Sequence, residues 1–375
     1  MSKFCYAPFI SISTDVNGSI RPCCRYAQPD KQIEYKMPNM KDGRIDELYN
    51  GEEFQKLRQA FNEGKMPAEC YTCWNEESAG VPSFRQMYFR KVKDNFNTEL
   101  RNYEPYLIDL KLNNVCNLKC RMCGPTASSS ILKEMEKQGV VFKDKDYWLS
   151  NKILDTENEE VFFKWLPNIM DLEFTGGEPF VSTENKELIR KISETEHAKN
   201  IKLTITTNGT HYDEEFVSCL QKFLFTVIGM SVDDMGARLE YLRKGANWER
   251  ILKNYKLFKE ADLDVYFAST ISSYNIFYIK ELHEYCESND IEWGYDFVHD
   301  PIQQNISTLP TFIKEELIEK YSDNEVYTNI VNMLKSDHIN AIVAFHKDIK
   351  KYDDLRNEKF EEIYPEWSEM ILYGM

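Results

Sequence analysis

Three closely spaced cysteines in the first half of the chain are the residues best suited to carry chemistry. Cys116, Cys120 and Cys123 have the spacing C-x3-C-x2-C and follow an apolar-alternating run over residues 106–112. Thiolates gathered on one short loop bind iron-sulfur clusters or zinc. Structural metal sites usually have four protein ligands, so three leave one coordination position open. The spacing therefore predicts a metal centre that a substrate or cofactor can reach.

A second motif lies further along the chain, where residues 170–175 run into Gly176-Gly177-Glu178-Pro179. Paired glycines let backbones approach closely, Pro179 stiffens the exit, and Glu178 offers a carboxylate. The three cysteines followed by this GGEP segment resemble the radical S-adenosylmethionine (radical SAM) superfamily. The resemblance implies that the cysteines hold a 4Fe-4S cluster, that the methionine end of SAM occupies the fourth iron, and that the GGEP segment binds the SAM amino group.

The same resemblance implies further contacts with SAM. The family often has an aromatic residue before the last cysteine, and here Met122 would pack against the adenine ring. Small polar residues at the ends of later strands would meet the ribose and methionine parts, and one arginine would pair with the SAM carboxylate. These residues are Thr207, Asn208, Ser231, Asp233 and Arg243. Asn-Gly and Asp-Asp are also ordinary turn residues, and a helix-end arginine is often solvated, so both interpretations stay open.

Another group of cysteines lies near the N-terminus. Cys5 and Cys23 form a C-x12-G-x4-C pattern, and Cys70 and Cys73 form a C-x2-C pair. Residues 9–12 and 19–20 flank a turn signal, which predicts a β-hairpin that brings Cys5 and Cys23 to one end. A predicted helix over residues 52–62 then returns the chain to Cys70.

This arrangement resembles the twitch module, the four-cysteine relative of the SPASM domain, which binds one auxiliary 4Fe-4S cluster. The resemblance implies that Cys5, Cys23, Cys70 and Cys73 are its ligands, although the module usually follows the barrel and here precedes it. Four thiolates also suit zinc. Cys24 is an alternative ligand, but the G-x4-C spacing selects Cys23.

After the cysteine loop, short apolar runs alternate with helical patterns, which predicts parallel strands joined by crossover helices. The predicted strands cover 106–113, 170–175, 201–206, 225–232, 263–270 and 291–298, and the predicted helices cover 127–138, 183–196, 213–222, 247–261 and 276–288. Periodicity alone does not separate a barrel from an open doubly wound sheet. The family resemblance implies the α/β partial (β/α)6 barrel of the TIM type, with its chemistry at the carboxyl ends of the strands.

The predicted organisation has four parts. A twitch-like module covers 1–75, an amphipathic linker helix with a solvated basic face (Arg85, Arg90, Lys91, Lys93) covers 76–104, the barrel covers 105–300, and a helical extension covers 301–375. At the end of the sixth strand, Tyr295 and His299 are candidates to face the cavity, with core and turn positions as the alternatives. Cys219 and Cys286 stand alone in helical patterns and are expected to be buried packing residues.

The composition of the chain argues against several classes of function. The 375-residue chain has a formal charge of −16, which argues against nonspecific nucleic-acid binding. It has ten cysteines but no signal-peptide pattern or membrane-length apolar run, so we expect a cytoplasmic protein with reduced thiols and no membrane partner.

The resemblance implies an enzyme that cleaves SAM to a 5′-deoxyadenosyl radical and abstracts a hydrogen atom from its substrate. The auxiliary cluster would assist electron transfer, and a donor such as flavodoxin or ferredoxin would supply electrons. Family relatives modify peptides or oxidise small sugar-like alcohols, so the substrate is expected to be a peptide or a small molecule. The competing hypothesis is a metal-stabilised binding or scaffold protein that carries zinc and does not turn over SAM.

Overall fold

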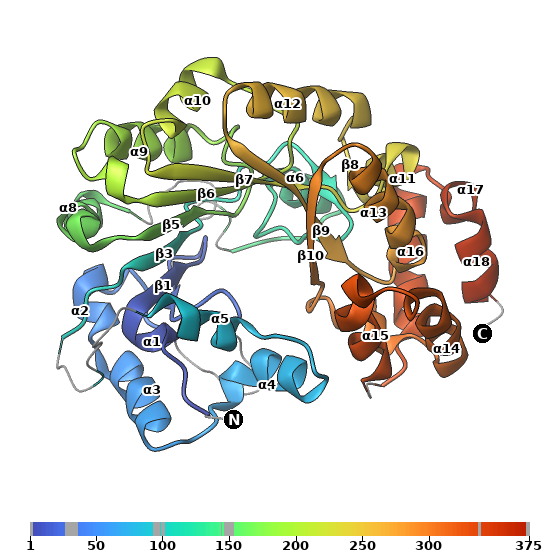
Figure 1. Cartoon of the computed structure of the whole chain (residues 1–375), viewed down its shortest axis with the longest axis horizontal. Coiled ribbons are helices and arrows are strands. Elements are labelled where there is room, and N and C mark those ends of the chain that lie inside the picture. Colours follow the sequence, from blue (N-terminus) through green and yellow to red (C-terminus); the bar gives the residue numbers. More distant parts are fainter. Residues whose placement is uncertain are drawn as a thin grey trace.

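The computed structural model describes residues 3–26, 37–92, 98, 102–143, 145, 154–336 and 339–372. Its centre is one eight-stranded sheet with the order β10-β9-β7-β6-β5-β3-β1-β2, in which only the edge strand β2 is antiparallel to its neighbour (Figure 1). The strands are β1 Ser11–Thr14, β2 Ile20–Arg21, β3 Leu107–Leu110, β5 Asp171–Phe174, β6 Lys202–Thr207, β7 Phe225–Ser231, β9 Asp264–Ile271 and β10 Glu292–Phe297. A separate antiparallel pair joins β4 (Lys119–Cys120) to β8 (Arg243–Lys244).

All six strands predicted for the barrel are present, and each pairs in parallel with the next one in the sheet. Buried and half-buried residues alternate along β6 and β9, because successive side chains of a strand point to opposite faces. The apolar residues pack against an outer layer of helices, which Figure 1 shows around the convex side of the curved sheet. The α/β partial-barrel prediction is confirmed.

The crossover helices begin at side-chain caps. Asp155, Ser182, Asp213 and Asn247 each accept a hydrogen bond from the backbone N–H three residues later. The helices of this part are α6 Ser129–Lys137, α8 Thr156–Trp165, α9 Thr183–Ser193, α10 Glu214–Leu220, α11 Gly236–Leu242, α12 Trp248–Glu260 and α13 Ile279–Ser288. The sequence patterns had not predicted α8 and α11.

The N-terminal cysteine segment is built into the barrel sheet. Strand β1 pairs in parallel with β3, with Ile12 opposite Ile108, so the predicted hairpin extends the barrel sheet. The hairpin starts later than predicted, because Phe9 and Ile10 belong to the short helix α1. The helices of this part are α1 Ala7–Ile10, α2 Ile45–Tyr49, α3 Glu52–Asn62, α4 Tyr71–Ser78 and α5 Phe84–Lys91.

The single linker helix predicted over 76–104 is wrong. The chain instead forms α4 and α5, separated by a break over residues 79–83 in which Gly80 has a φ of +77°. Helix α5 begins with a capping box formed by Ser83 and Gln86. Lys93 and Phe96, which belonged to the predicted helix, lie outside the described residues.

The C-terminal part is helical, as predicted, and it forms a second hydrophobic core together with residues of the later barrel. It contains α14 Thr311–Tyr321, α15 Thr328–Lys335, α16 Ile342–Arg356, α17 Phe360–Ile363 and α18 Pro365–Leu372. Short 3-10 turns cover Ala68–Cys70, Leu166–Asn168, Ala198–Asn200, Ile276–Tyr278, Ile302–Gln304, Ile306–Thr308 and Glu325–Tyr327. Among the described helices, none has the length and apolar character needed to cross a membrane.

Because β1 belongs to the barrel sheet, we expect an Ile12→Ala substitution to destabilise the module and the barrel together. Ile12 is fully buried, and truncating such a side chain typically costs about 2–5 kcal/mol. Chemical denaturation followed by circular dichroism and by tryptophan fluorescence should show one transition at a lower midpoint. The control is Ile339→Ala, since Ile339 is 91% exposed. An early module transition with an unshifted barrel transition would show that the module folds independently.

Candidate functional site

The cysteine loop and the GGEP segment lie against each other at the carboxyl ends of β3 and β5. The backbone N–H of Glu178 donates to the carbonyl of Val115 at 2.7 Å. Gly177 has a φ of +57°, and a Cβ atom there would lie 2.5 Å from the Val115 oxygen. Only glycine allows this approach. The two motifs therefore form one site.

The three cysteines of the loop are free thiols, and N–H groups are directed at the sulfurs of Cys116 and Cys120. Leu118 N lies 3.5 Å and Asn208 Nδ2 3.9 Å from the Cys116 sulfur, and Arg243 Nη1 lies 3.8 Å from the Cys120 sulfur. Burial raises the pKa of Cys116 to about 12, whereas hydrogen bonding from Cys123 lowers the pKa of Cys120 to about 7. A bound cation reverses the penalty that burial places on a thiolate. The donor set fits a cluster with one open position.

The carboxylate of Glu178 is turned into the protein. It accepts hydrogen bonds from the Thr207 hydroxyl and the Asn208 N–H, both at 2.6 Å, and from the Phe180 N–H at 3.0 Å. Desolvation raises its pKa while these donors act in the opposite direction. The side chains of Glu178 and Thr207 therefore hold the ends of β5 and β6 together, and their assignment to SAM binding stays a prediction.

Arg243 is buried against the cysteine loop, so it is not a solvated helix-end charge. Its Nε donates to Asp233 Oδ2 at 2.7 Å, while Asp233 Oδ1 accepts from the Thr270 N–H. The carboxylate of Asp233 is thus committed to Arg243 and to the backbone, and it lies behind the guanidinium group. Ser231 and Met122 are half-buried.

A buried arginine ties the cysteine loop to the C-terminal helices. The Arg121 side chain is 0% exposed, and its Nη2 donates to Asp353 and to Glu358, both at 2.7 Å. Its guanidinium carbon lies 3.6 Å from the ring centroid of Tyr241. We call Arg121, Tyr241, Asp353 and Glu358 the arginine clamp. The sequence did not predict this group. The one local signal was the position of Arg121 between two candidate ligands, Cys120 and Cys123.

The four N-terminal cysteines lie round one cavity. Cys5, Cys23, Cys70 and Cys73 line a small pocket together with Arg25, Tyr26, Phe61, Arg85 and Tyr88. Burial raises the pKa of each of the four thiols, that of Cys5 to about 12, so thiolates here need a cationic partner. The four sulfurs and two flanking arginines fit a cluster of net negative charge.

Cys24 does not line this cavity. Cys24 is exposed, whereas Cys5 and Cys73 are buried and Cys23 and Cys70 are half-buried. The structure therefore groups Cys23 with the other three cysteines.

The predicted solvated basic face is wrong for Arg85. Arg85 is buried, pairs with Glu77 at 2.5 Å, donates to the Phe4 carbonyl at 2.7 Å and lies 4.9 Å from the Trp74 ring. Of the other residues assigned to that face, Arg90 is exposed and Lys91 pairs with Asp171.

Three further predicted positions have structural contacts. The Tyr295 hydroxyl donates to the Val326 carbonyl at 3.0 Å, so this side chain packs towards the C-terminal helices. Cys286 is buried, as expected, but Cys219 is only half-buried. His299 lies beside Glu76 of α4.

Residues 110–286 match the family model described as the radical SAM superfamily. Residues 110–286 therefore form a radical SAM domain. Residues 5–74 match the iron-sulfur cluster-binding domain called SPASM, which confirms that this module precedes the radical SAM domain. These domains imply a 4Fe-4S cluster with SAM and an auxiliary iron-sulfur centre.

The chain is 22% identical over 246 residues to the radical SAM cyclopropyl synthase TigE of Paramaledivibacter caminithermalis. This match covers 63% of the chain and 48% of TigE, so it spans about half the relative's length. Solved structures that are similar include anSMEcpe with bound AdoMet and the Cp18Cys peptide (20% identity, TM-score 0.39, 60% of this chain and 61% of that one). Another is SuiB of Streptococcus suis (15% identity, TM-score 0.40, 87% and 70%).

The arginine clamp generates a prediction about the radical SAM cluster. In the double variant Asp353→Asn with Glu358→Gln, Arg121 stays buried without a carboxylate, which costs about 3–5 kcal/mol. We expect the reconstituted variant to lose up to about four irons per chain, while the auxiliary centre stays loaded. Iron analysis and electron paramagnetic resonance measure both.

The matched control for the clamp is Glu362→Gln, which removes one partner of the exposed pair with Lys359. Exposed pairs contribute about 0–1 kcal/mol, so iron content should not change. Full iron content and unchanged stability in the double variant would contradict the role given to the clamp.

Gly177 generates a prediction about SAM binding. A Gly177→Ala substitution places Cβ against the Val115 oxygen and displaces the GGEP loop from the cysteine loop. We expect equilibrium dialysis to show SAM affinity at least about tenfold lower, with the iron content retained. Gly139→Ala is the control, because Gly139 also has a positive φ but no atom lies within 4 Å of its added Cβ. Unchanged SAM affinity in Gly177→Ala would refute the assignment.

Proposed function

We propose that this radical SAM protein cleaves SAM reductively and abstracts a hydrogen atom from a peptide or small-molecule substrate, with the auxiliary 4Fe-4S cluster assisting electron transfer. The observation that carries the proposal is the contact between the three-cysteine loop and the GGEP loop at the carboxyl edge of the sheet. Three thiolates leave an open metal position beside the glycine-rich GGEP loop, and an open position is what a directly bound cofactor requires.

When bound, the cluster and SAM supply the one-electron chemistry that forms the 5′-deoxyadenosyl radical. The protein's own residues hold and orient these groups. Asn208 and Arg243 direct N–H groups at the sulfurs of Cys116 and Cys120, and such contacts shift the potential of a cluster. Asp233 fixes the position of Arg243.

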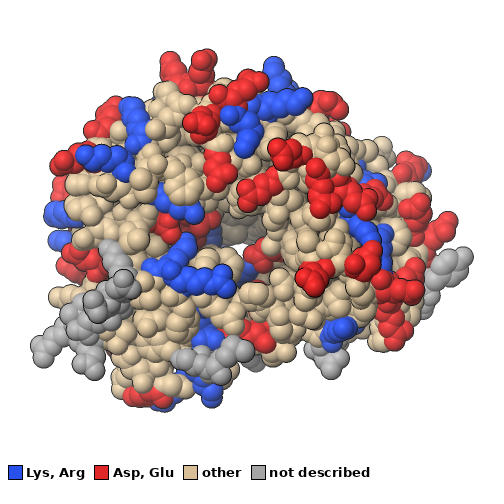
Figure 2. Space-filling model, in the orientation of Figure 1, with Lys and Arg blue, Asp and Glu red and all other residues tan. Residues whose placement is uncertain are grey.

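The barrel interior supports a polar substrate. Asp109 accepts hydrogen bonds from Ser13 at 2.6 Å and Thr175 at 2.7 Å, and Lys111 lies 3.8 Å from the same carboxylate. Burial, with the charge of Asp109, raises the pKa of nearby Glu173 to about 7. The face drawn in Figure 2 is hollowed at its centre, with charged side chains around the opening. A substrate in this interior would meet carboxylates and an ammonium group, which recognise polar rather than purely apolar molecules.

The test is anaerobic reconstitution followed by addition of SAM and a strong reductant. We expect about eight irons per chain and detectable 5′-deoxyadenosine. Replacing Cys116, Cys120 and Cys123 with alanine should remove about four irons and abolish SAM cleavage, because the open site is lost. Replacing Cys5, Cys23, Cys70 and Cys73 should remove the other four and leave SAM cleavage at least partly intact.

Cys24→Ala and Cys286→Ala are the matched single-thiol controls, and both should keep the full iron content. Loss of auxiliary iron in Cys24→Ala would reassign that ligand. Zinc in place of iron, with SAM untouched, would overturn the proposed activity in favour of a metal-stabilised scaffold.

A further inference from the structure

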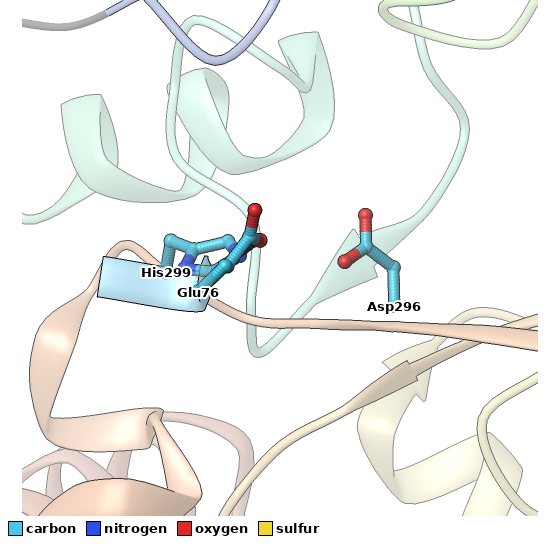
Figure 3. Close-up of side chains that lie close together, drawn as sticks. All are labelled: Glu76, Asp296 and His299. Atoms are coloured by element: carbon cyan, nitrogen blue, oxygen red, sulfur yellow. Dashed lines mark ion pairs between the residues drawn. The ribbon is translucent and has the colours of Figure 1, made fainter. Parts of the chain in front are cut away.

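Three potential metal ligands meet where the N-terminal module faces the last barrel strand. Glu76 comes from α4, Asp296 from β10 and His299 from the segment after β10. One ligand atom from each lies within 4.8 Å of the others. Figure 3 shows Glu76 and His299 side by side, with the Asp296 carboxylate near them. None of the three is among the cysteine ligands assigned above.

One oxygen of the Glu76 carboxylate is buried without a hydrogen-bond partner in the part of the chain that the structure describes. Its side chain is only 4% exposed, and its Oε2 has no hydrogen-bond partner among the described residues. A buried carboxylate oxygen without a partner is costly, and such groups normally bind a donor or a metal. This observation is independent of the clustering of the three residues.

The contact between Glu76 and His299 has the geometry of two ligands. Glu76 Oε1 lies 3.1 Å from His299 Nε2, yet this buried nitrogen makes no hydrogen bond of acceptable geometry within the described structure. Zinc binds histidine nitrogen and carboxylate oxygen at about 2.0–2.2 Å, which places neighbouring ligands of a tetrahedron roughly 3.3 Å apart. The two atoms therefore lie at the spacing expected for a shared third atom.

Asp296 completes the set from the opposite side. Its side chain is 48% exposed, and its Oδ2 pairs with Arg25 while Oδ1 accepts from the Phe297 N–H. Arg25 is thus the competitor at this position, and a bound cation would share or replace its contact with Asp296. Since Asp296 is exposed, a metal here would keep coordination positions for water or another ligand.

We propose that Glu76, His299 and Asp296 form a divalent-metal site of the zinc class that joins the N-terminal module to the last strand of the barrel. A metal at this position would stabilise the structure, because β10 and β2 are the two edge strands of the sheet and are not hydrogen-bonded to each other. One imidazole and two carboxylates suit zinc better than the thiolate-preferring metals. The metal would add a second side-chain link beside the ion pair of Arg25 with Asp296.

The experiment uses the cluster-loaded protein, so that the cysteines are already occupied, in a Cys24→Ala background that removes an exposed thiol. The protein is dialysed anaerobically against micromolar zinc, and zinc and iron are counted on the same sample. We expect one zinc per chain beyond the iron. Glu76→Gln and His299→Ala should each weaken zinc binding at least about tenfold, and Asp296→Asn less, with iron unchanged.

His197→Ala is the control, because this half-buried histidine lies in a different part of the molecule. Zinc bound equally by the triad variants and by the control, or no zinc at all, would overturn the site and leave only a direct contact between Glu76 and His299. His299 is partly exposed, so His299→Ala keeps the test valid if Glu76→Gln does not fold. The iron count and 5′-deoxyadenosine assay on the same samples separate this outcome from failure of the proposed activity.

Discussion

The buried carboxylate of Glu178 is the constraint on which the geometry of the SAM site depends. Burial favours its neutral form, and three donors from two different strand ends oppose that preference. These hydrogen bonds join the loop after β5 to the end of β6. They also fix Asn208, whose amide reaches both Asn117 and the sulfur of Cys116. Through these contacts, one buried side chain helps to set the distance between the two motifs.

The other charged side chains of the site are also paired and largely buried. Arg243 is opposed by Asp233, and Arg121 by Asp353 and Glu358. Charges buried in this way are costly to leave unpaired, so each pair fixes the position of the element that carries its partner. The cysteine loop is consequently held from both sides, by the barrel through β8 and by the C-terminal helices through Arg121.

The sequence predicted the features that have a local signature. Short apolar runs located all six barrel strands, and cysteine spacing grouped the seven thiols that the structure places at two positions. Features that depend on distant partners were missed. The sequence pattern placed Arg85 on the surface, but in the structure it is buried against Glu77 and Trp74. Similarly, nothing near Arg121 in the sequence indicates that its partner is Asp353. The extension of the sheet by β1 was missed for the same reason, because no local pattern states which strand will be a neighbour.

The arginine clamp also sets an order of events during synthesis. A ribosome delivers every cysteine of both sites long before it delivers Asp353 and Glu358. Until those carboxylates have been made, the guanidinium of Arg121 lacks these two partners, and burying its unpaired charge would be energetically costly. The loop therefore reaches its final shape only after the residues 232 and 237 positions further along the chain have been made and have folded against it.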